Sequence, residues 1–527
     1  MRRKIYIKAG SAAVICAMAL SSCTKSFEDF NTNPDAVQTV DVKSYITTMQ
    51  MDAVIPCSDE GANEFQRACN LMGDSFAGYF GATQAFEGGS YTCTYNLDGT
   101  DYNNVPFSVA FTNVMPAWLN LKYGFANEQL DEASFAIAQV IKVMSIQRTT
   151  DIYGPVPVTH FGEDVSPYDS QKDVYEFLFN ELNSAIEVLK VYTSATEGST
   201  SNPPLYYADL IYKGKYSSWL KLANSVKLRM AMRIRFVEPA LARQYAEAAV
   251  ADGVMESASD GAYLKSSETI QVFNPIEEVW NAYSDTRMGA TIDAYMNGYN
   301  DPRLPKYFKE AEIDGGGYHG IRCGIQTMSK ADYLGLSVPN VSKNTPVVWM
   351  KASEVAFLRA EAAILSWNVG GTAQEFYKKG VELSFEENSL SASAAAEYMN
   401  SDNQPAAFED KNASWTKNNY NKPSTITPKW DEAANTETKL ERIITQKYIA
   451  IYPDGQEAWS EFRRTGYPKV IPIVNNLSGG KINTQTQVRR MTFPRSEYAN
   501  NATEVAQAVS LLGGPDTGAT KLWWDKK

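Results

Sequence analysis

Residues 353–387 have the sequence SEVAFLRAEAAILSWNVGGTAQEFYKKGVELSFEE, and this stretch decides the fold class. In its first half, apolar side chains recur at steps of three or four residues: Val355, Leu358, Ala362 and Leu365. In its second half, the same spacing recurs at Tyr377, Val381 and Phe385. Each set lies on one face of a helix. Gly370 and Gly371 separate the two helices, and glycine pairs are typical of turns. The stretch therefore predicts a helical hairpin.

Two further features of this hairpin point to stacked repeats. Ser353 is a residue type that caps helix N-termini, so we expect it to cap the first helix. Small side chains on that helix would let a neighbouring helix approach closely: Ala352, Ala356, Ala360 and Ala363. The unit is close in length to the roughly 34 residues of a tetratricopeptide repeat, although it lacks the full repeat signature. Stacked helical hairpins build a curved solenoid.

Other segments show the same helical periodicity. From Val174 to Leu189, apolar residues again fall at steps of three and four, and Ser170 and Asp173 resemble a capping pair just before them. Helices are also predicted over about 216–236 and 438–452. One face of the first of these is basic, which we interpret as a solvated or salt-bridged surface: Lys221, Lys227, Arg229, Arg233 and Arg235. The predicted fold class is therefore mainly α.

Long irregular stretches separate the predicted helices. They span about 78–107, 191–206, 255–346, 388–437 and 465–498, and they are rich in Gly, Asn, Pro, Tyr and Ser. Loops of this length in a compact protein usually carry function or are disordered. Their many aromatic residues favour packed, ordered loops.

The N-terminus has the pattern of a bacterial lipoprotein precursor. Basic residues at Arg2, Arg3 and Lys4 precede an apolar run over 9–20, which is shorter than the roughly 20 residues of a membrane-spanning helix. Leu20-Ser21-Ser22-Cys23 then forms a lipobox. We expect residues 1–22 to be a signal peptide, Cys23 to be lipidated, 23–42 to form a tether, and 43–527 to form a single helical domain.

Composition excludes several classes of function. The 527-residue chain has 61 acidic and 49 basic residues and a net charge of −12, which disfavours nucleic-acid binding. Only two histidines are present, His160 and His319, so a zinc site or a histidine-based catalytic centre is poorly supplied. We expect no metal and no cofactor.

Cysteine usage does not indicate a disulfide scaffold. Cys16 lies in the predicted signal peptide and Cys23 is the predicted lipidation site, which leaves Cys57, Cys69, Cys93 and Cys323. No two of them form a CxxC motif. An oxidising compartment permits a disulfide, but the sequence alone does not assign one.

A set of short strings, taken in order, resembles the SusD/RagB family of outer-membrane nutrient-binding lipoproteins from Bacteroidetes. After the lipobox, the strings are FEDFNTNP at 27–34, DIYGPVP at 151–157, ANS at 223–225, LRMAMR at 228–233, DPR at 301–303, AEA at 360–362, QKY at 446–448, RRTGYP at 463–468 and WWD at 523–525. The resemblance covers essentially the whole mature chain. Each string alone is a weak signal, and the ordered set together with the lipobox is a strong one.

The resemblance implies a fold, a location and a partner. It implies about four tetratricopeptide-like hairpins packed against a loop-rich region. It implies a protein that is lipid-anchored in the outer membrane, faces the cell exterior and acts as a hinged lid on a SusC-like TonB-dependent transporter. The implied ligands are oligosaccharides most often and oligopeptides in some members. It does not imply catalysis.

Two loops offer the side chains that sugar recognition needs, namely flat aromatic faces beside a few polar groups. In the loop over 78–96 the candidate ligand-binding residues are Gln84, Phe86, Tyr91, Tyr95 and Asn96. In the loop over 274–288 they are Asn274, Trp280, Tyr283 and Arg287. For each aromatic residue, burial within the loop is about as well supported as a ligand contact. The first loop has no tryptophan, which weakens a starch-specific interpretation and leaves peptides and other glycans open.

Several conspicuous residues are interpreted as structural instead. We expect Asp301 and Arg303 to pair, Arg463 and Arg464 to pair with carboxylates inside the scaffold, and Trp523-Trp524 to anchor the C-terminal tail by packing.

Three functions remain open at this point. The first is nutrient capture. The second is a surface glycoside hydrolase, which needs two carboxylates about 5–9.5 Å apart, and no motif singles out such a pair. The third is a scaffold of helical repeats that only binds other proteins.

Overall fold

The computed structural model of the protein describes residues 41–58, 61–86, 92–97, 101–325, 329–412 and 417–527. The predicted signal peptide, Cys23 and nearly all of the predicted tether lie outside these residues, so those assignments stay predictions. Within the described residues, no helix is both long and apolar enough to cross a membrane.

The described residues are mainly helical, which confirms the predicted fold class. The longer helices are α3 (Val42–Asp52), α6 (Met115–Ala126), α7 (Glu132–Tyr153), α8 (Gln171–Ala195), α9 (Tyr216–Ile234), α10 (Pro239–Ala251), α12 (Ala290–Tyr299), α14 (Ala352–Ile364), α15 (Ala373–Glu387), α16 (Ala392–Met399), α17 (Thr436–Ala450), α18 (Gly455–Thr465) and α20 (Ala502–Leu511). Shorter α-helices are α4 (Asn63–Phe65), α5 (Val105–Ser108), α11 (Pro275–Glu277), α13 (Leu304–Tyr307) and α19 (Arg495–Asn500).

Irregular helical turns and short strands complete the fold. The π-helical segments are Gln66–Asp74, Val109–Val114 and Glu278–Ala282. The 3₁₀ turns are Thr92–Thr94, Tyr102–Asn104, Ala258–Asp260 and Lys330–Tyr333. The strands are β1 (Phe80–Ala82), β2 (Ala262–Leu264), β3 (Thr286–Met288) and β4 (Val347–Met350), and they form two antiparallel pairs, β1 with β3 and β2 with β4.

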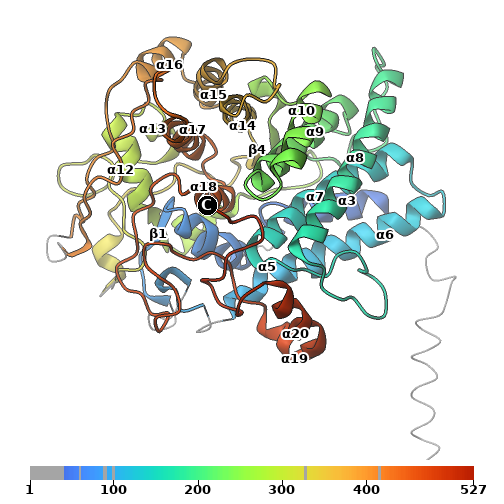
Figure 1. Ribbon diagram of the computed structural model, residues 1–527, viewed down its shortest axis with the longest axis horizontal. Helices are drawn as coiled ribbons and strands as arrows, with labels where there is room; N and C mark the ends of the chain where they lie inside the picture. Colours follow the sequence, from blue (N-terminus) through green and yellow to red (C-terminus); the bar gives the residue numbers. More distant parts are fainter. Residues whose placement is uncertain (1–40, 59–60, 87–91, 98–100, 326–328, 413–416) are drawn as a thin grey trace, which may run out of the picture.

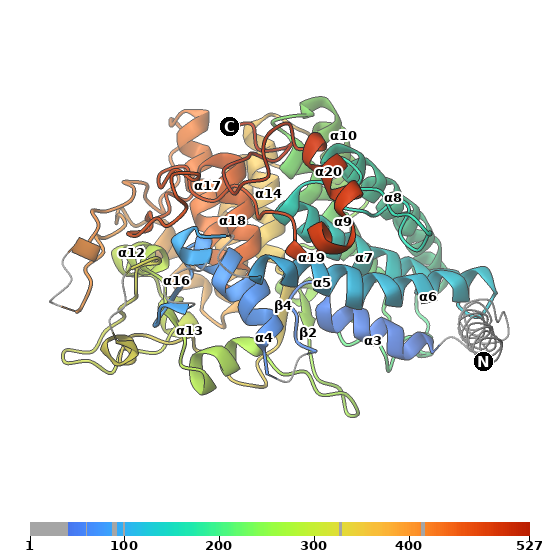
Figure 2. The same cartoon turned by 90° about the horizontal axis from the view of Figure 1, so that it is seen from below.

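The helices pack in pairs, as expected for stacked hairpins. Direct contacts join α3 with α6, α7 with α8, α9 with α10, and α14 with α15, while α17 packs on both helices of the last pair. Helices α3 and α6 to α10 occupy one side of the molecule, and the long loops with α12, α13 and α16 occupy the other (Figures 1 and 2). The two strand pairs are too small to form a layer.

The hairpin over 353–387 is present, with one correction to its cap. Helix α14 begins at Ala352, and the side chain of Ser353 does not cap it. Instead, the backbone N–H and the hydroxyl of Ser353 both donate to the Glu387 carboxylate at the end of α15, at 3.0 and 2.6 Å. Ser353 therefore ties the two helices together. Gly380 of α15 lies against the ring of Phe357, which shows how closely the helices approach.

The capping pair before α8 is confirmed. The Ser170 hydroxyl accepts a hydrogen bond from the backbone N–H of Asp173 at 3.2 Å, and the helix begins at Gln171. Helix α15 has a complete capping box between Thr372 and Glu375. These local signals fix the helix N-termini because they satisfy N–H groups that lack a partner within the helix.

The basic face of α9 forms salt bridges, but most of it does not lie at the surface where the sequence placed it. Lys221, which pairs with Asp260, is 43% exposed, whereas Lys227, Arg229 and Arg233 are buried. Arg229 pairs with Glu354 of α14 at 2.6 Å, and both side chains are 2% exposed. Arg233 is fully buried and pairs with Asp151, Glu457 and Glu461. The amphipathic pattern was misleading because the charged face of α9 packs against the charged faces of other helices.

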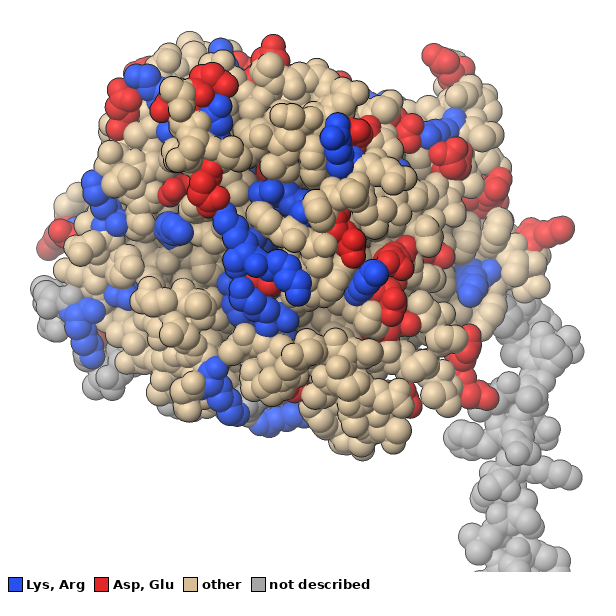
Figure 3. Space-filling view, viewed as in Figure 1, with Lys and Arg blue, Asp and Glu red and all other residues tan. Residues whose placement is uncertain are grey.

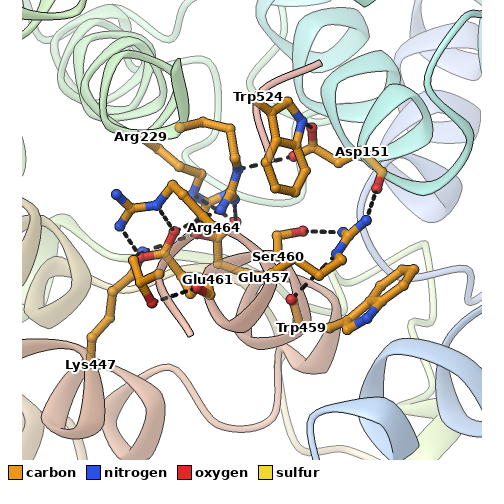
Figure 4. A network of polar contacts seen from close by, with 12 residues as sticks. Asp151, Arg229, Lys447, Glu457, Trp459, Ser460, Glu461, Arg464 and Trp524 are labelled. Atoms are coloured by element: carbon orange, nitrogen blue, oxygen red, sulfur yellow. Dashed lines mark hydrogen bonds and ion pairs between the residues drawn. The ribbon is translucent and has the colours of Figure 1, made fainter. Parts of the chain in front are cut away.

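These pairs belong to a larger buried ion network between α7, α9, α14, α17 and α18 (Figure 4). Its five basic members are Arg229, Arg233, Arg235, Lys447 and Arg464, and its five acidic members are Asp151, Glu354, Glu361, Glu457 and Glu461. Buried charges are costly unless each is paired and hydrogen-bonded. Here each charged group has at least one opposite partner, so the network holds the helices in one arrangement.

The other residues interpreted as structural also lie in the interior. Arg303 is fully buried and pairs with Asp301 at 2.6 Å. Arg464 pairs with Glu361 and Glu461, whereas Arg463 donates to the backbone carbonyls of Asp151 and Arg489. Trp524 is fully buried, and its indole N–H donates to Asp151 at 2.8 Å, so the C-terminal tail is anchored in the helical core.

Charge is unevenly spread over the surface. On the face shown in Figure 3, basic side chains gather near the centre, where the C-terminus lies, and acidic side chains are frequent over the helical side. Lys521, Lys526 and Lys527 at this end of the chain are exposed.

Candidate ligand-binding face

The two loops predicted to form the ligand platform lie side by side. Strand β1 pairs antiparallel with β3, with Phe80 opposite Met288 and Ala82 opposite Thr286. Beyond the strands, the Thr83 N–H donates to the Asp285 carbonyl at 2.9 Å, and its hydroxyl donates to the Ser284 carbonyl at 2.8 Å. Residues 84–86 and 281–284 therefore leave the same end of the strand pair.

The Asp285 carboxylate joins these loops to two other segments. One oxygen, Oδ1, accepts from the Gln84 side-chain amide and from the Lys330 ammonium at 2.7 Å. The other, Oδ2, accepts from the Gln66 side chain at 2.9 Å. Asp285 is 6% exposed, so its carboxylate lies below the surface and holds these three side chains from beneath. Because each partner comes from a different segment, this carboxylate fixes the relative positions of the loops.

Five of the predicted side chains are partly open to solvent. Gln84, Phe86, Asn96, Trp280 and Tyr283 are all half-buried. Phe86 rests on a small apolar cluster with Leu71 and Ala82. Half-buried aromatic rings beside amide and ammonium groups are the combination that binds the apolar face and the hydroxyls of a sugar.

Trp280 is held in one orientation. Its indole N–H donates to the Val341 carbonyl at 2.9 Å, and the Lys309 ammonium lies 4.3 Å from the ring centroid. A cation over an indole face is attracted by the ring quadrupole. This face of Trp280 is therefore already covered, and only the remaining exposed part of the ring is open to a ligand.

Three of the predicted ligand residues are buried. Tyr95 is 2% exposed and packs edge-on against Phe76. Asn274 caps α11 by accepting from the Ile276 N–H, and it donates to the Thr345 carbonyl. Arg287 donates to the Leu334 and Thr286 carbonyls. Their burial argues against a direct contact between these side chains and a ligand.

Arg287 remains charged despite its burial. Burial lowers its pKa to about 10, against the opposing effect of Asp285 and Glu312. At neutral pH the guanidinium therefore still carries a proton and continues to donate to the carbonyls that shape the loop over 329–336. Arg287 was predicted to contact the ligand. Instead, it supports the loops of the platform from the interior.

Two residues that hold the Asp285 carboxylate were not predicted from the sequence, and one predicted residue is not described by the structure. Gln66 lies in the π-helical segment and Lys330 in a distant loop, and no motif links either to Asp285. Tyr91 lies outside the described residues, and its role stays a prediction.

The described residues offer little for metal binding. They hold no group of three or more His, Cys, Asp or Glu side chains placed to bind a metal ion. His160 pairs with Glu163 at the surface, and the His319 ring lies 3.0 Å from the Gly316 carbonyl.

A hollow of about 900 Å³ lies away from the platform, between the end of α8 and the start of α9. Its walls carry Ser and Thr side chains from residues 193–201, together with Tyr206, Tyr212 and Tyr216. Its size and polar lining make it the main rival location for a ligand.

Comparison with known proteins agrees with this architecture. The family model of SusD and RagB outer-membrane lipoproteins matches residues 29–525. A chitin-binding SusD homologue from Flavobacterium johnsoniae is 38% identical, with a TM-score of 0.86, over 92% of this chain and 99% of that one.

Further solved structures are similar to the same extent. A SusD homologue from Bacteroides thetaiotaomicron is 38% identical and one from Bacteroides ovatus is 37% identical, each with a TM-score of 0.84 and with the same coverage of 92% and 99%. No curated protein gives a significant match. The family match and these similarities show that the chain belongs to the SusD/RagB family of outer-membrane lipoproteins.

Proposed function

We propose that this protein is a cell-surface lipoprotein that captures oligosaccharides and delivers them to a SusC-like TonB-dependent transporter. The observation that carries the proposal is the meeting of the loops over 83–86 and 281–285 above one buried carboxylate, Asp285. The half-buried aromatic rings and polar donors of these two loops support a binding face there.

The ligand class follows from the chemistry of that face and from a relative. Phe86 and Tyr283 offer ring surface, and Gln84 and Lys330 offer donors that can reach ring hydroxyls. The homologue from Flavobacterium johnsoniae is described as chitin-binding, so oligosaccharides of N-acetylglucosamine are the first candidates.

Membership of the family supports the location and the partner. The family is one of outer-membrane lipoproteins, and Cys23 in the lipobox is the expected attachment point for lipid. A lipid-anchored protein beside a transporter barrel holds its ligand close to the entry of the pore. This raises the effective concentration of the ligand at the pore. We assign the protein a binding role and no catalytic one.

Isothermal titration of residues 24–527 tests the ligand class directly. The panel contains oligosaccharides of N-acetylglucosamine, neutral malto-oligosaccharides, acidic oligosaccharides and mixed oligopeptides. We expect saturable heat with one glycan class and no release of shorter sugars on long incubation. Saturable heat with peptides alone would move the protein to peptide capture, and release of shorter sugars would favour the hydrolase.

A pair of variants assigns the binding to the proposed face. Phe86→Ala removes a half-buried ring from the platform, and Tyr123→Ala removes a 48% exposed ring from α6, outside it. We expect only the first to weaken binding. If the two variants bind the ligand with equal affinity, the ligand does not bind at the proposed platform.

A further inference from the structure

Two cysteines, both free thiols in the structure, lie next to each other beside the candidate ligand-binding face. Cys93 is fully buried in the 3₁₀ turn Thr92–Thr94 and belongs to a small apolar cluster with Leu71 and Ala82. Cys323, which comes from a segment far along the chain, packs against the same cluster.

The backbones of these two segments are in direct contact. A Cβ atom added to Gly324 would lie 2.7 Å from the Cys93 carbonyl oxygen, and Gly324 has a φ of +68°, which favours glycine. A third segment holds both in place: Asn475 N–H donates to the Gly324 carbonyl at 2.9 Å, and Leu477 N–H donates to the Thr94 carbonyl at 2.7 Å. The two cysteines therefore sit on a fixed frame.

The Cys93 thiol donates to the Leu71 carbonyl at 3.6 Å, within the cluster that Cys323 packs against. A hydrogen bond with Cys93, together with burial, raises the pKa of the Cys323 thiol well above its usual range. The other two cysteines in the described residues have different surroundings. The Cys57 thiol donates to the Met51 carbonyl at 3.0 Å, and Cys69 is buried in the π-helical segment beside Asp74.

We propose that Cys93 and Cys323 form a disulfide in the mature protein and that this bond staples the ligand-binding loop to the segment over 321–325. Thiols in the cytoplasm stay reduced, whereas an outer-membrane lipoprotein matures in the cell envelope, where disulfides form and persist. Contact between the two backbones and a shared apolar cluster keep the two cysteines close together, which is the first requirement of a disulfide.

The reaction is a thiol–disulfide exchange. The oxidant is a protein disulfide of the envelope: one thiolate attacks it to give a mixed disulfide, and the second thiolate then displaces the reduced oxidant. The two cysteines lose two protons and two electrons, and the oxidant leaves as a dithiol. Because Cys93 is fully buried in the folded chain and out of reach of a protein oxidant, we infer that the exchange precedes the final packing of this region.

The bond would constrain the platform as well as the fold. A cross-link that closes a long loop removes conformational freedom from the unfolded chain. It also joins the segment that carries Phe86 and Asn96 to the one that pairs with Gly289 through Ile321, close to β3. The cross-link itself does not depend on the proposed function, whereas an effect on ligand affinity does.

Peptide mapping of the full mature lipoprotein tests the proposal. Free thiols are blocked with N-ethylmaleimide in denaturant before any purification, and no reductant is used. We expect one peptide pair joined through Cys93 and Cys323, with a mass about 2 Da below the sum of the two thiol peptides, and we expect it to disappear on reduction. Cys57 and Cys69 should carry the blocking group.

Matched variants make the result specific. Cys93→Ser should leave Cys323 open to N-ethylmaleimide in denaturant, and Cys57→Ser should leave the linked pair intact. If Cys93→Ser does not fold, the map of the natural chain still decides the matter. The proposal would be wrong if both Cys93 and Cys323 carry the blocking group. It would also be wrong if either residue is joined to another cysteine. If the Cys93–Cys323 link is found but reductant does not change ligand affinity, the disulfide is established. Only its role in shaping the platform is then contradicted.

Discussion

The helical core and the ligand-binding face both depend on buried carboxylates, but they use them differently. In the core, Glu457 and Glu461 pair only with charged groups that are themselves buried, such as Arg233 and Lys447. On the face, Asp285 is buried, while its partners Gln84 and Lys330 are half-buried, and the Lys330 side chain is 33% exposed.

This difference separates stability from recognition. A fully buried, fully paired network permits one arrangement and is intolerant of losing any member. A buried carboxylate beneath half-exposed donors fixes the base of a platform and leaves its upper side able to contact a ligand. We therefore expect substitutions in the core to cost folding free energy and substitutions on the face to cost affinity.

The largest effect is expected from Arg464→Met in the core. It removes one of the two cationic partners of Glu361 and one of the three cationic partners of Glu461. Removal of one member of a buried ion pair costs about 3–5 kcal/mol. Unfolding in urea, followed by circular dichroism, measures the loss. Arg243→Met is the matched control because the Arg243 side chain is 54% exposed and its partner Glu247 is 29% exposed, and we expect a change of about 0.5 kcal/mol or less. If the two variants lose similar amounts of unfolding free energy, the buried ion pairs are no more important for stability than the exposed pair.

The core should also be sensitive to acid. Burial alone would raise the pKa of Glu457, but Arg233, Lys447 and Arg229 outweigh burial and lower it to about 2. A carboxyl group with a depressed folded-state pKa stabilises the fold above its unfolded pKa, and this contribution is lost as the pH falls towards the folded value. We expect melting temperature to fall between about pH 4.5 and pH 2. Glu457→Gln should flatten that slope, and an unchanged pH profile in this variant would refute the assignment.

On the face, Asp285→Ala should affect affinity and stability together. It leaves Gln66, Gln84 and Lys330 without their shared acceptor, and an unsatisfied buried polar group costs about 1–3 kcal/mol. Titration with the ligand identified in the panel and thermal melting provide the two measurements. Asp164→Ala, at an exposed position, is the control. Full affinity in Asp285→Ala would show that the loops do not need this anchor.

The smallest effect is expected from Phe86→Ala. The ring is half-buried and rests on a small cluster, so its removal should leave the melting temperature nearly unchanged. Loss of one aromatic contact corresponds to about 0.5–1.5 kcal/mol, or roughly a 2- to 12-fold weaker affinity. A large fall in stability would show that Phe86 belongs to the core instead.

Local sequence patterns predicted the helices well and their environment less well. The spacing of Val355, Leu358 and Ala362 identified α14, and Ser170 with Asp173 marked the start of α8, because these signals act within one or two turns. The basic face of α9 was misplaced because burial depends on which helix packs against it. Ser353 was misassigned for the same reason: its partner, Glu387, lies on another helix.

The sequence predicted part of the arrangement of the candidate ligand-binding face, and ligand binding there stays a prediction. Composition identified the two loops, and the pairing of β1 with β3 brings them together. Which side chains point outward could not be read from composition, and Tyr95, Asn274 and Arg287 turned out to be buried. Gln66 and Lys330 escaped prediction because a contact between residues so far apart in sequence leaves no local signal.

Hydrogen exchange with and without a bound oligosaccharide shows where on the protein the ligand binds. The glycan that gives saturable heat is added in excess, and deuterium uptake is compared peptide by peptide. The account predicts protection of peptides that cover 83–97 and 281–285, with little change over 193–217. Protection confined to 193–217, which line the hollow between α8 and α9, would contradict it and place the ligand there.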